Sequence, residues 1–359
     1  MKKHLGFKVE RIPLASGRLV FFVSLLAILA AFVVAGIFFQ IYGVSPIKAY
    51  QLILHGSLGS RFGIAETVRR TIPLLLCGVG LTIAFRALFW NIGAEGQLLM
   101  GAVAAAGVAL FSGLPVPLLL PAMFIGGFIG GAAWGLIPAI LKVMLGLNDV
   151  ITTLMMNYIA IYFVEWLIHG PWKGPTARGF AYTDTFPRSA WLPTIYGTRI
   201  HWPTLVLGLV LAFIMYLMVT RTRSGFEIRV IGENPNAARF AGISQLKTTL
   251  LVMLISGGFA GLAGVGEVAG IHQRLLGPTN ISMGYGYTAI IVAWLARRNP
   301  LAVIVTSLLF GAIMTGGDVI KVSLGLPFQL INVFNGLILF FLIGSEILLR
   351  YRISFLLRR

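Results

Sequence analysis

Three acidic residues lie inside apolar stretches of this sequence, and they are the first candidates for chemistry within a membrane. Glu95, Glu165 and Glu267 are these residues, whereas most of the other acids fall near the ends of apolar stretches or between them. An ion-coupled carrier ordinarily places pairs of acids in the middle of its spans. The spacing of these three residues gives no such centred pair, which disfavours a stand-alone ion-coupled carrier.

Amide side chains interrupt the apolar sequence at two places. The segment from Asn91 to Gln97, which includes Glu95, combines amides with glycines at the junction of two apolar stretches. Because backbone freed by glycine needs partners inside a membrane, this segment predicts a broken helix or re-entrant turn, or a short loop capped by Asn91 and Glu95. Asn157, followed by Tyr158, is more central in its stretch. Its amide must pair either with a polar solute or, more often, with another helix as a staple.

Motifs for enzyme chemistry are absent. The sequence contains no GxxxxGK[ST] phosphate loop, no HExxH and no GxSxG, and its five histidines are scattered without the spacing of metal ligands. Cys77 is the single cysteine, so no internal disulfide or cysteine metal cluster can form. These absences disfavour an integral membrane enzyme. They also mean that any ATP that drives transport must bind to another chain.

The composition is that of a polytopic membrane protein. Hydrophobic residues make up 58% of the 359 positions and charged residues only 11%, which is more apolar surface than a soluble core can bury. The net charge of +17 would favour nucleic acid as the partner of a soluble protein. Here the distribution of charge between the loops explains it better, so we expect no nucleic-acid partner.

A scan for apolar stretches of about 20 residues predicts an all-α fold with about ten transmembrane helices in one domain, residues 1–359. The predicted spans are 19–41, 66–88, 94–112, 115–141, 149–169, 202–220, 246–270, 282–296, 300–316 and 329–349. With the N-terminus in the cytoplasm, the inside segments hold 18 of the 28 Lys and Arg residues. This bias predicts that both termini are cytoplasmic, and we interpret the first span as a retained signal anchor.

A charged cytoplasmic loop at 221–247 is predicted to contain a short helix. The helix starts at Asn234, with Pro235 in the first helical position, and stops at Gly242. Docking to a soluble partner and an ordinary interfacial helix are equally consistent with this spacing. The face available for docking would combine small and larger side chains: Ala237, Ala238, Ala241, Phe240 and Ile243.

The sizeable loop predicted on the outside is 170–202, which is rich in tryptophan and proline. A lid or receptor-contact surface is one interpretation of this loop, and anchoring at the membrane interface by its tryptophans is the other. Two glycine stripes in the spans predict close backbone approach between helices in a tightly packed bundle. They consist of Gly127, Gly131 and Gly135, and of Gly257, Gly261 and Gly264.

Several strings of the sequence resemble one transporter family, over most of the chain. The string GENPNAARFAGI at 232–243 resembles the cytoplasmic coupling segment of bacterial ABC importer permeases in the branched-chain amino acid, ribose and nucleoside superfamily. The strings NIGAEGQ at 91–97, ITTLMMNY at 151–158 and GYGYTAI at 284–290 resemble its nucleoside branch. One departure is AWLARRNP at 293–300, where relatives tend to have Ala-Leu-Leu-Gly before Asn-Pro, so that Trp294 places a bulky side chain near the cavity end.

The resemblance implies a complex in the bacterial inner (cytoplasmic) membrane. In such a complex two permease subunits, identical or different, sit on two ABC ATP-binding subunits, and an extracytoplasmic substrate-binding lipoprotein delivers the solute. Membrane lipid surrounds the permease. ATP and Mg are implied on the partner ATPase, and no cofactor is expected on this chain. Motion of the short helix with the ATPase would switch the bundle between outward and inward access.

The resemblance also implies roles for individual residues. A nucleoside is neutral and polar with an aromatic face, so amides and aromatic rings would suit its route. The expected solutes are nucleosides or related purines, and the alternative is a simple-sugar permease of the ribose type. The coupling candidates are Gly232, Glu233, Asn234, Ala237, Ala238, Phe240 and Gly242, and the substrate-pathway candidates are Phe85, Asn91, Glu95, Gln97, Asn157, Tyr158 and Glu267.

Overall fold

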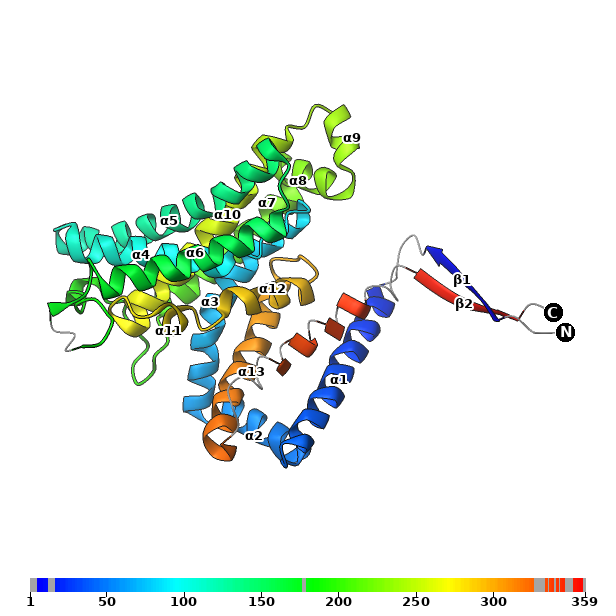
Figure 1. Cartoon of the computed structure of the whole chain (residues 1–359), viewed down its shortest axis with the longest axis horizontal. Helices are drawn as coiled ribbons and strands as arrows, with labels where there is room; N and C mark the ends of the chain where they lie inside the picture. The colour runs from blue at the N-terminus through cyan, green and yellow to red at the C-terminus, as the bar shows by residue number, and fades with distance from the viewer. Residues whose placement is uncertain are drawn as a thin grey trace. The chain divides into compact units, whose positions relative to one another are not determined.

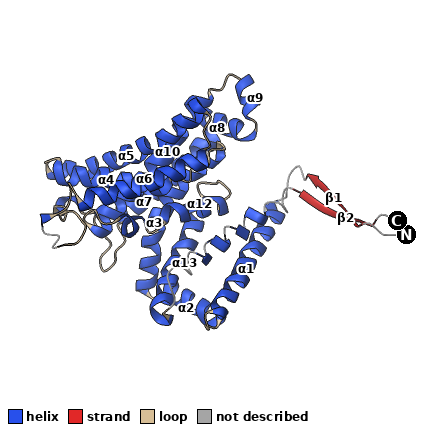
Figure 2. Cartoon of the chain, in the orientation of Figure 1, coloured by secondary structure: helices blue, strands red, loops and turns tan. Residues whose placement is uncertain are grey.

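The chain is almost entirely α-helical in the computed structural model (Figure 2). The structure describes residues 5–11, 17–175, 179–325 and 351–357, together with the pieces 333–334, 336–338, 340–341 and 343–345. The chain divides into two compact units, residues 1–56 with 316–359 and residues 57–315. The assignment of one transmembrane domain to the whole chain stays a prediction.

The unit that contains both ends of the chain combines helices with one strand pair. Strand β1, Leu5–Arg11, pairs antiparallel with β2, Tyr351–Leu357, so the two terminal segments lie side by side. The all-α prediction did not include this pair, although both segments alternate apolar and polar residues with the period of a strand. Helices α1, Gly17–Ile41, and α2, Pro46–Leu58, meet at a bend of 111°.

The larger unit is a bundle of long apolar helices. In the described residues seven helices are long and apolar enough to cross a membrane, or eight if the bent pair of α1 and α2 forms one span. The seven are α3, Arg61–Arg86; α4, Ala94–Phe111; α5, Val116–Leu145; α6, Asp149–His169; α7, Trp202–Arg221; α10, Gln245–Gly266, with its continuation to His272; and α13, Ala302–Leu324, which begins in this unit.

Glycine packing joins α5 to α10 at the centre of the bundle. A β-carbon added at Gly131 would lie 2.3 Å from the carbonyl oxygen of Gly257, and one at Gly261 would lie 2.1 Å from the carbonyl oxygen of Gly127. Any larger residue would push these two backbones apart. The prediction of close helix approach at the two stripes is therefore confirmed. Gly264 makes the corresponding approach to α4, where its β-carbon would lie 2.1 Å from the carbonyl oxygen of Leu98.

The predicted span 282–296 is wrong. The chain forms two short helices here, α11, Pro278–Ser282, and α12, Tyr285–Leu295, separated by Met283 and Gly284 in left-handed conformations. The 11 residues of α12 rise only about 16 Å, whereas the hydrocarbon core is about 30 Å thick. The next predicted span, 300–316, is longer in the structure as α13, and the last, 329–349, falls largely outside the described residues. The total of about ten spans is not reached in the part of the chain that the structure describes.

The loop after α7 is more helical than predicted. Helix α8, Arg223–Glu233, precedes α9, Pro235–Phe240, so the charged loop contains two helices at an angle to each other (Figure 1). Helix α7 starts at the end of the loop 170–202 and finishes next to α8. The α8 and α9 pair and the loop 170–202 therefore lie at opposite ends of the bundle (Figure 1).

Candidate functional site

A network of buried amides closes the junction between α3 and α4. The side chains of Asn91 and Gln97 donate to each other reciprocally, at 2.9 and 3.0 Å, and Asn91 Nδ2 also donates to the Ser256 hydroxyl of α10 at 3.0 Å. Asn91 Oδ1 additionally accepts the backbone N–H of Gly93 at 3.0 Å, and both amides are buried. These two candidates for solute contact hold the irregular backbone between α3 and α4 in place.

Asn157 staples α6 to the same junction. Its Oδ1 accepts the backbone N–H of Gly96 at 2.8 Å, and its Nδ2 donates to the carbonyl oxygen of Ile92 at 2.8 Å and to the Tyr287 hydroxyl at 3.2 Å. The side chain is wholly buried and its hydrogen-bonding capacity is used within the protein. Tyr158, the neighbouring candidate, instead points outward with 49% of its surface exposed.

Glu95 connects α4 to the start of α12. Its Oε2 accepts the backbone N–H of Gly286 at 2.8 Å, and the Ser282 hydroxyl and the backbone of Gly284 and Tyr287 also hydrogen-bond to it. A carboxylate at a helix N-terminus satisfies N–H groups that have no partner within the helix. Glu95 therefore fixes α12, the short helix that replaces the predicted span.

One ion pair that the sequence did not reveal locks the neighbouring helix ends. Lys142 Nζ lies 2.6 Å from Asp149 Oδ2, which also accepts the backbone N–H of Trp90 at 2.7 Å. The only signal in the sequence was a basic and an acidic residue seven positions apart across the turn from α5 to α6. The pair ties this turn to the segment that follows α3.

Three aromatic rings gather where α3 and α12 end. The rings of Trp90 and Trp294 have centroids 4.9 Å apart, and that of Phe85 lies 5.6 Å from Trp90 and 5.8 Å from Trp294. Trp294, the departure from the family pattern, is thus packed against a predicted pathway residue. Phe85 is buried, whereas Trp90 keeps 37% of its surface exposed.

A second polar cluster lies toward the opposite end of the bundle, and the sequence identified only Glu267 in it. Arg69 Nε donates to Glu66 Oε1 at 2.7 Å, and Arg69 Nη1 lies 3.9 Å from Glu267 Oε2. His272 Nε2 lies 3.8 Å from the same oxygen. The spacing of Glu66 and Arg69, three residues apart in a helix, was a signal of their pairing. Their meeting with Glu267 joins segments about 200 residues apart.

His201 borders this cluster at the start of α7. Its Nδ1 is hydrogen-bonded to the Thr204 hydroxyl, and the side chain is wholly buried. Burial, together with the nearby Arg69 guanidinium, lowers the pKa of His201 to about 3, so the imidazole is neutral at physiological pH. Within the residues that the structure describes, no three His, Cys, Asp or Glu side chains are placed to hold a metal ion.

The loop 170–202 folds back on the continuation of α10. The backbone N–H groups of Thr183, Phe186 and Leu192 donate to carbonyl oxygens of Leu275, Gln273 and Ala269, at 3.1, 2.8 and 3.0 Å. Its described part is therefore pinned across the segment that carries Glu267. Whether it acts as a lid or receptor surface stays a prediction.

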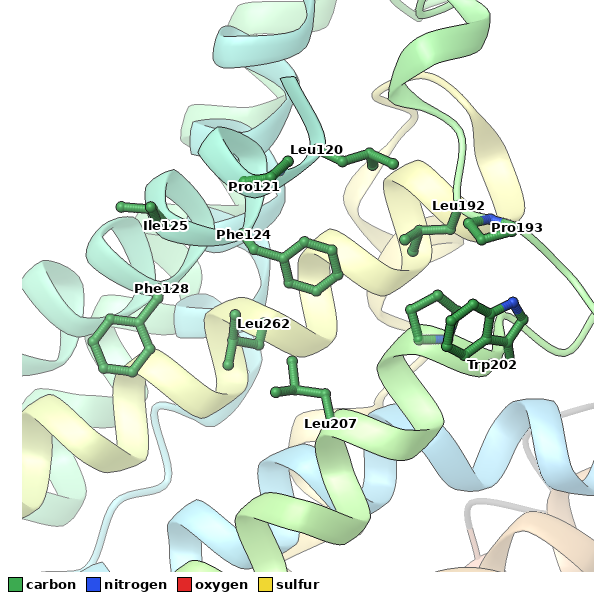
Figure 3. Close-up of a pocket in the computed structure, with 11 residues that line it drawn as sticks. Leu120, Pro121, Phe124, Ile125, Phe128, Leu192, Pro193, Trp202, Leu207 and Leu262 are labelled. Atoms are coloured by element: carbon green, nitrogen blue, oxygen red, sulfur yellow. The ribbon is translucent and has the colours of Figure 1, made fainter. Parts of the chain in front are cut away.

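An apolar groove of about 640 Å³ opens between α5, α7 and this loop (Figure 3). Phe124, Trp202, Leu207 and Leu262 are among its lining residues, all of which are apolar or aromatic. A polar solute would lose its hydrogen bonds to water without gaining others here. The lining of this groove therefore does not suit a polar solute.

Helix α9 presents one large apolar side chain outward. Asn234 caps it by accepting the backbone N–H groups of Asn236 and Ala237, which confirms the predicted start. Phe240 is 94% exposed, whereas Ala238 is only 2% exposed. The expectation that Ala238 lies on the docking face is wrong, because this methyl group faces the rest of its own chain.

The junction of α8 with α3 allows no side chain. A β-carbon added at Gly232 would lie 1.8 Å from the carbonyl oxygen of Arg86. The Arg86 guanidinium in turn donates from Nε to the carbonyl oxygen of Arg298 at 2.6 Å. Arg297 and Arg298 both adopt positive φ, which is strained for residues with side chains. Arg86 thus connects α8 with the turn that leads from α12 to α13.

Comparison with known proteins decides the family. The model of the family described as branched-chain amino acid transport system / permease component matches residues 63–343, which contain every cluster above. The chain belongs to this permease family. The resemblance inferred from residues 91–97, 151–158, 232–243 and 284–290 is confirmed.

The permease is also similar to curated transport proteins along most of its length. It is 36% identical to the glucose ABC transporter permease protein TsgB13 of Haloferax volcanii, over 92% of this chain and 88% of that protein. It is 32% identical to the nucleoside ABC transporter permease protein NupB of Lactococcus lactis, over 89% of this chain and 90% of that protein. It is 31% identical to the guanosine ABC transporter permease protein NupP of Bacillus subtilis, over 90% of this chain and 93% of that protein. The permease is therefore a multi-pass membrane protein and the permease subunit of an ABC transporter.

Proposed function

We propose that this permease imports nucleosides or related purines, driven by ATP that a separate ATP-binding subunit hydrolyses. Two nucleoside permeases among its relatives, NupB and NupP, support this choice of solute. The 36% identity to the glucose permease TsgB13 supports the second candidate, a simple sugar. Nucleosides and sugars are both uncharged and rich in hydroxyl groups, which fits a bundle whose buried acids Glu95 and Asp149 already engage backbone N–H groups or a basic side chain.

The observation that carries the coupling mechanism is the contrast between Phe240 and Ala238 on α9. The Phe240 ring is almost fully exposed and contributes little to packing within this chain, and aromatic anchors dominate protein interfaces. Ala238 packs inward, so the helix is held by its own chain while the ring projects. We infer that α9 docks into a groove of the ATPase subunit and that Gly232, Glu233, Asn234, Ala237 and Gly242 shape this contact.

The rest of the proposed complex is arranged around this contact. The α8 and α9 end faces the cytoplasm, where the ATPase binds ATP and Mg, and both termini lie on the same side. The loop 170–202 faces outward, toward a substrate-binding lipoprotein. A second permease subunit, identical or different, completes the transporter in the inner membrane.

Transport by the assembled complex tests this function. The permease is co-expressed with its ATPase and binding protein, reconstituted in proteoliposomes, and assayed for ATP-dependent uptake of radiolabelled nucleosides and hexoses side by side. Uptake of nucleosides supports the first candidate, and uptake confined to hexoses supports the second. Uptake without ATP, or a purified permease that never associates with an ATPase, would overturn the proposal.

A further inference from the structure

The carboxylate of Glu267 is an acceptor that no described side chain or backbone group satisfies. The residue is wholly buried, and neither of its oxygens has a hydrogen-bond partner among the described residues. Arg69 Nη1 and His272 Nε2 lie 3.9 and 3.8 Å from Oε2, beyond hydrogen-bond length. Burial of a carboxylate without hydrogen bonds is costly, and a gap of this size between polar groups has room for a bridging water or another group that can both donate and accept.

The surroundings hold these three groups in a fixed arrangement. Glu66 engages Nε and Nη2 of Arg69, which leaves Nη1 directed toward Glu267. Glu267 and His272 are the first and last residues of a π-helical segment, Glu267–His272, in which residues five apart come together. π-helical turns of this kind occur frequently at functional sites. The Tyr285 hydroxyl also lies beside the Arg69 guanidinium.

The charges of the four groups at the centre of the cluster balance, which favours an uncharged ligand. Arg69 and Arg70 face Glu66 and Glu267, so two positive and two negative groups lie together. The charge of Arg199, on the exposed loop 170–202, interacts electrostatically with Glu66 and Glu267 from the edge of the cluster. A cation would meet two guanidinium groups and an anion would meet two carboxylates. An uncharged group that both donates and accepts hydrogen bonds, such as a hydroxyl, fits this environment.

The cluster reaches the surface at His272. This side chain is 18% exposed, whereas that of Glu267 is fully covered. The loop segment from Thr183 to Leu192 lies across the π-helical segment through its backbone hydrogen bonds. A ligand would therefore reach the carboxylate past His272, at the end of the bundle opposite α9.

We propose that Glu267, Arg69 and His272 bind hydroxyl groups of the uncharged solute as it enters the permease. A ribose or hexose hydroxyl donates to Glu267 and accepts from Arg69 or His272. This inference rests on the proposed function, because it assigns the solute's hydroxyl groups to residues of the proposed importer. Water carries the same chemistry, and the experiment below separates the two sources.

The test pairs Glu267→Gln with solutes that lack single hydroxyl groups. The complete transporter is reconstituted in proteoliposomes, and kcat/KM of uptake is measured for the transported nucleoside or hexose and for each monodeoxy analogue. With the wild-type permease, kcat/KM for one analogue should be about tenfold lower than for the parent solute, which is the magnitude of a hydrogen bond to a charged group. With Glu267→Gln, kcat/KM for the same analogue should be close to that for the parent solute, because the carboxylate that accepts the missing hydroxyl has already been replaced. Discrimination by the binding protein is the same for the wild-type and variant permeases, so it cancels when their ratios of analogue to parent kcat/KM are compared.

Two further variants keep the outcome decisive. His272→Gln, at the exposed rim, should likewise reduce the discrimination against that analogue, and it serves if Glu267→Gln does not assemble. Glu165→Gln, at a half-exposed acid of α6, is the matched control and should leave the ratio between analogues unchanged. If every analogue shows the same reduction in kcat/KM with the wild type as with the variants, the cluster holds only water and the inference is overturned. Absence of wild-type uptake of every nucleoside and hexose would instead overturn the proposed function.

Discussion

Gly232 of α8 packs directly on the carbonyl oxygen of Arg86 in α3, at a distance that leaves no room for a β-carbon. Helix α3 is the most buried of the long helices, since 94% of its apolar 18-residue stretch is buried. This contact gives movement of α8 a direct route to the centre of the bundle. The second bond of Arg86, to the carbonyl oxygen of Arg298, extends the connection to the turn after α12.

Gly232→Ala should uncouple transport from ATP hydrolysis. The added methyl group would lie 1.8 Å from the Arg86 carbonyl oxygen, so α8 must shift, at a cost of about 1–3 kcal/mol. We expect solute uptake to fall at least tenfold while the complex still assembles. Uptake and ATPase activity of the reconstituted transporter measure the two effects. Gly277→Ala is the matched control, because its β-carbon would make only ordinary contacts at 3.6 Å and beyond. Unchanged uptake by Gly232→Ala would contradict this role.

Phe240→Ala should weaken docking of the ATPase without altering the fold. The ring is 94% exposed and therefore contributes little to packing within this chain. Loss of an aromatic anchor at an interface costs about 2 kcal/mol or more, which corresponds to at least a thirtyfold weaker association. Binding of the purified ATPase to permease in nanodiscs measures this directly. Ala238→Glu serves as the contrast, since it should lower the thermal stability of the permease itself. If the ATPase binds Phe240→Ala and the wild type with equal affinity, α9 is not part of the interface.

Asn157→Ala should destabilise the bundle. The substitution leaves the backbone N–H of Gly96 and the carbonyl oxygen of Ile92 without their partner, and hydrogen bonds between membrane helices contribute about 0.6–2 kcal/mol each. We expect a lower melting temperature in detergent, by several degrees. Tyr158→Phe, at the exposed neighbouring position, should leave the melting temperature unchanged. A variant Asn157→Ala that melts like wild type but transports poorly would instead assign this amide to the solute.

The stability of the permease should fall in mild acid because His201 resists protonation. Its pKa in the folded chain is about 3, against 6.5 for the ordinary histidine that the unfolded chain exposes. The unfolded state therefore binds more protons between these values, and the loss grows as pH falls below about 6.5, by up to about 1.4 kcal/mol per pH unit. Melting temperatures between pH 7.5 and 5 measure the slope, and His201→Gln should flatten it. An identical slope in the variant would assign the pH dependence to other groups.

Local patterns in the sequence predicted those features that depend on neighbours along the chain. Apolar length alone placed α1, α4, α6 and α7 within a few residues, since a membrane helix satisfies its backbone internally. The start of α9 followed from Asn234 and Pro235, whose capping chemistry is local. Glycine periodicity predicted the close packing of α5 and α10, because residues at this spacing share one helix face.

The sequence by itself thus determined a multi-pass helical permease with a short capped helix in its charged loop, because hydrophobic length, capping and family motifs are written in consecutive residues. The tertiary structure alone decided that Glu95 caps α12, that Ala238 faces inward while Phe240 projects, and that Arg69 meets Glu267. These relationships join segments brought together only by helix packing. A side chain's partner across the bundle depends on how each helix is rotated and crossed, and the order of residues along one helix does not specify this.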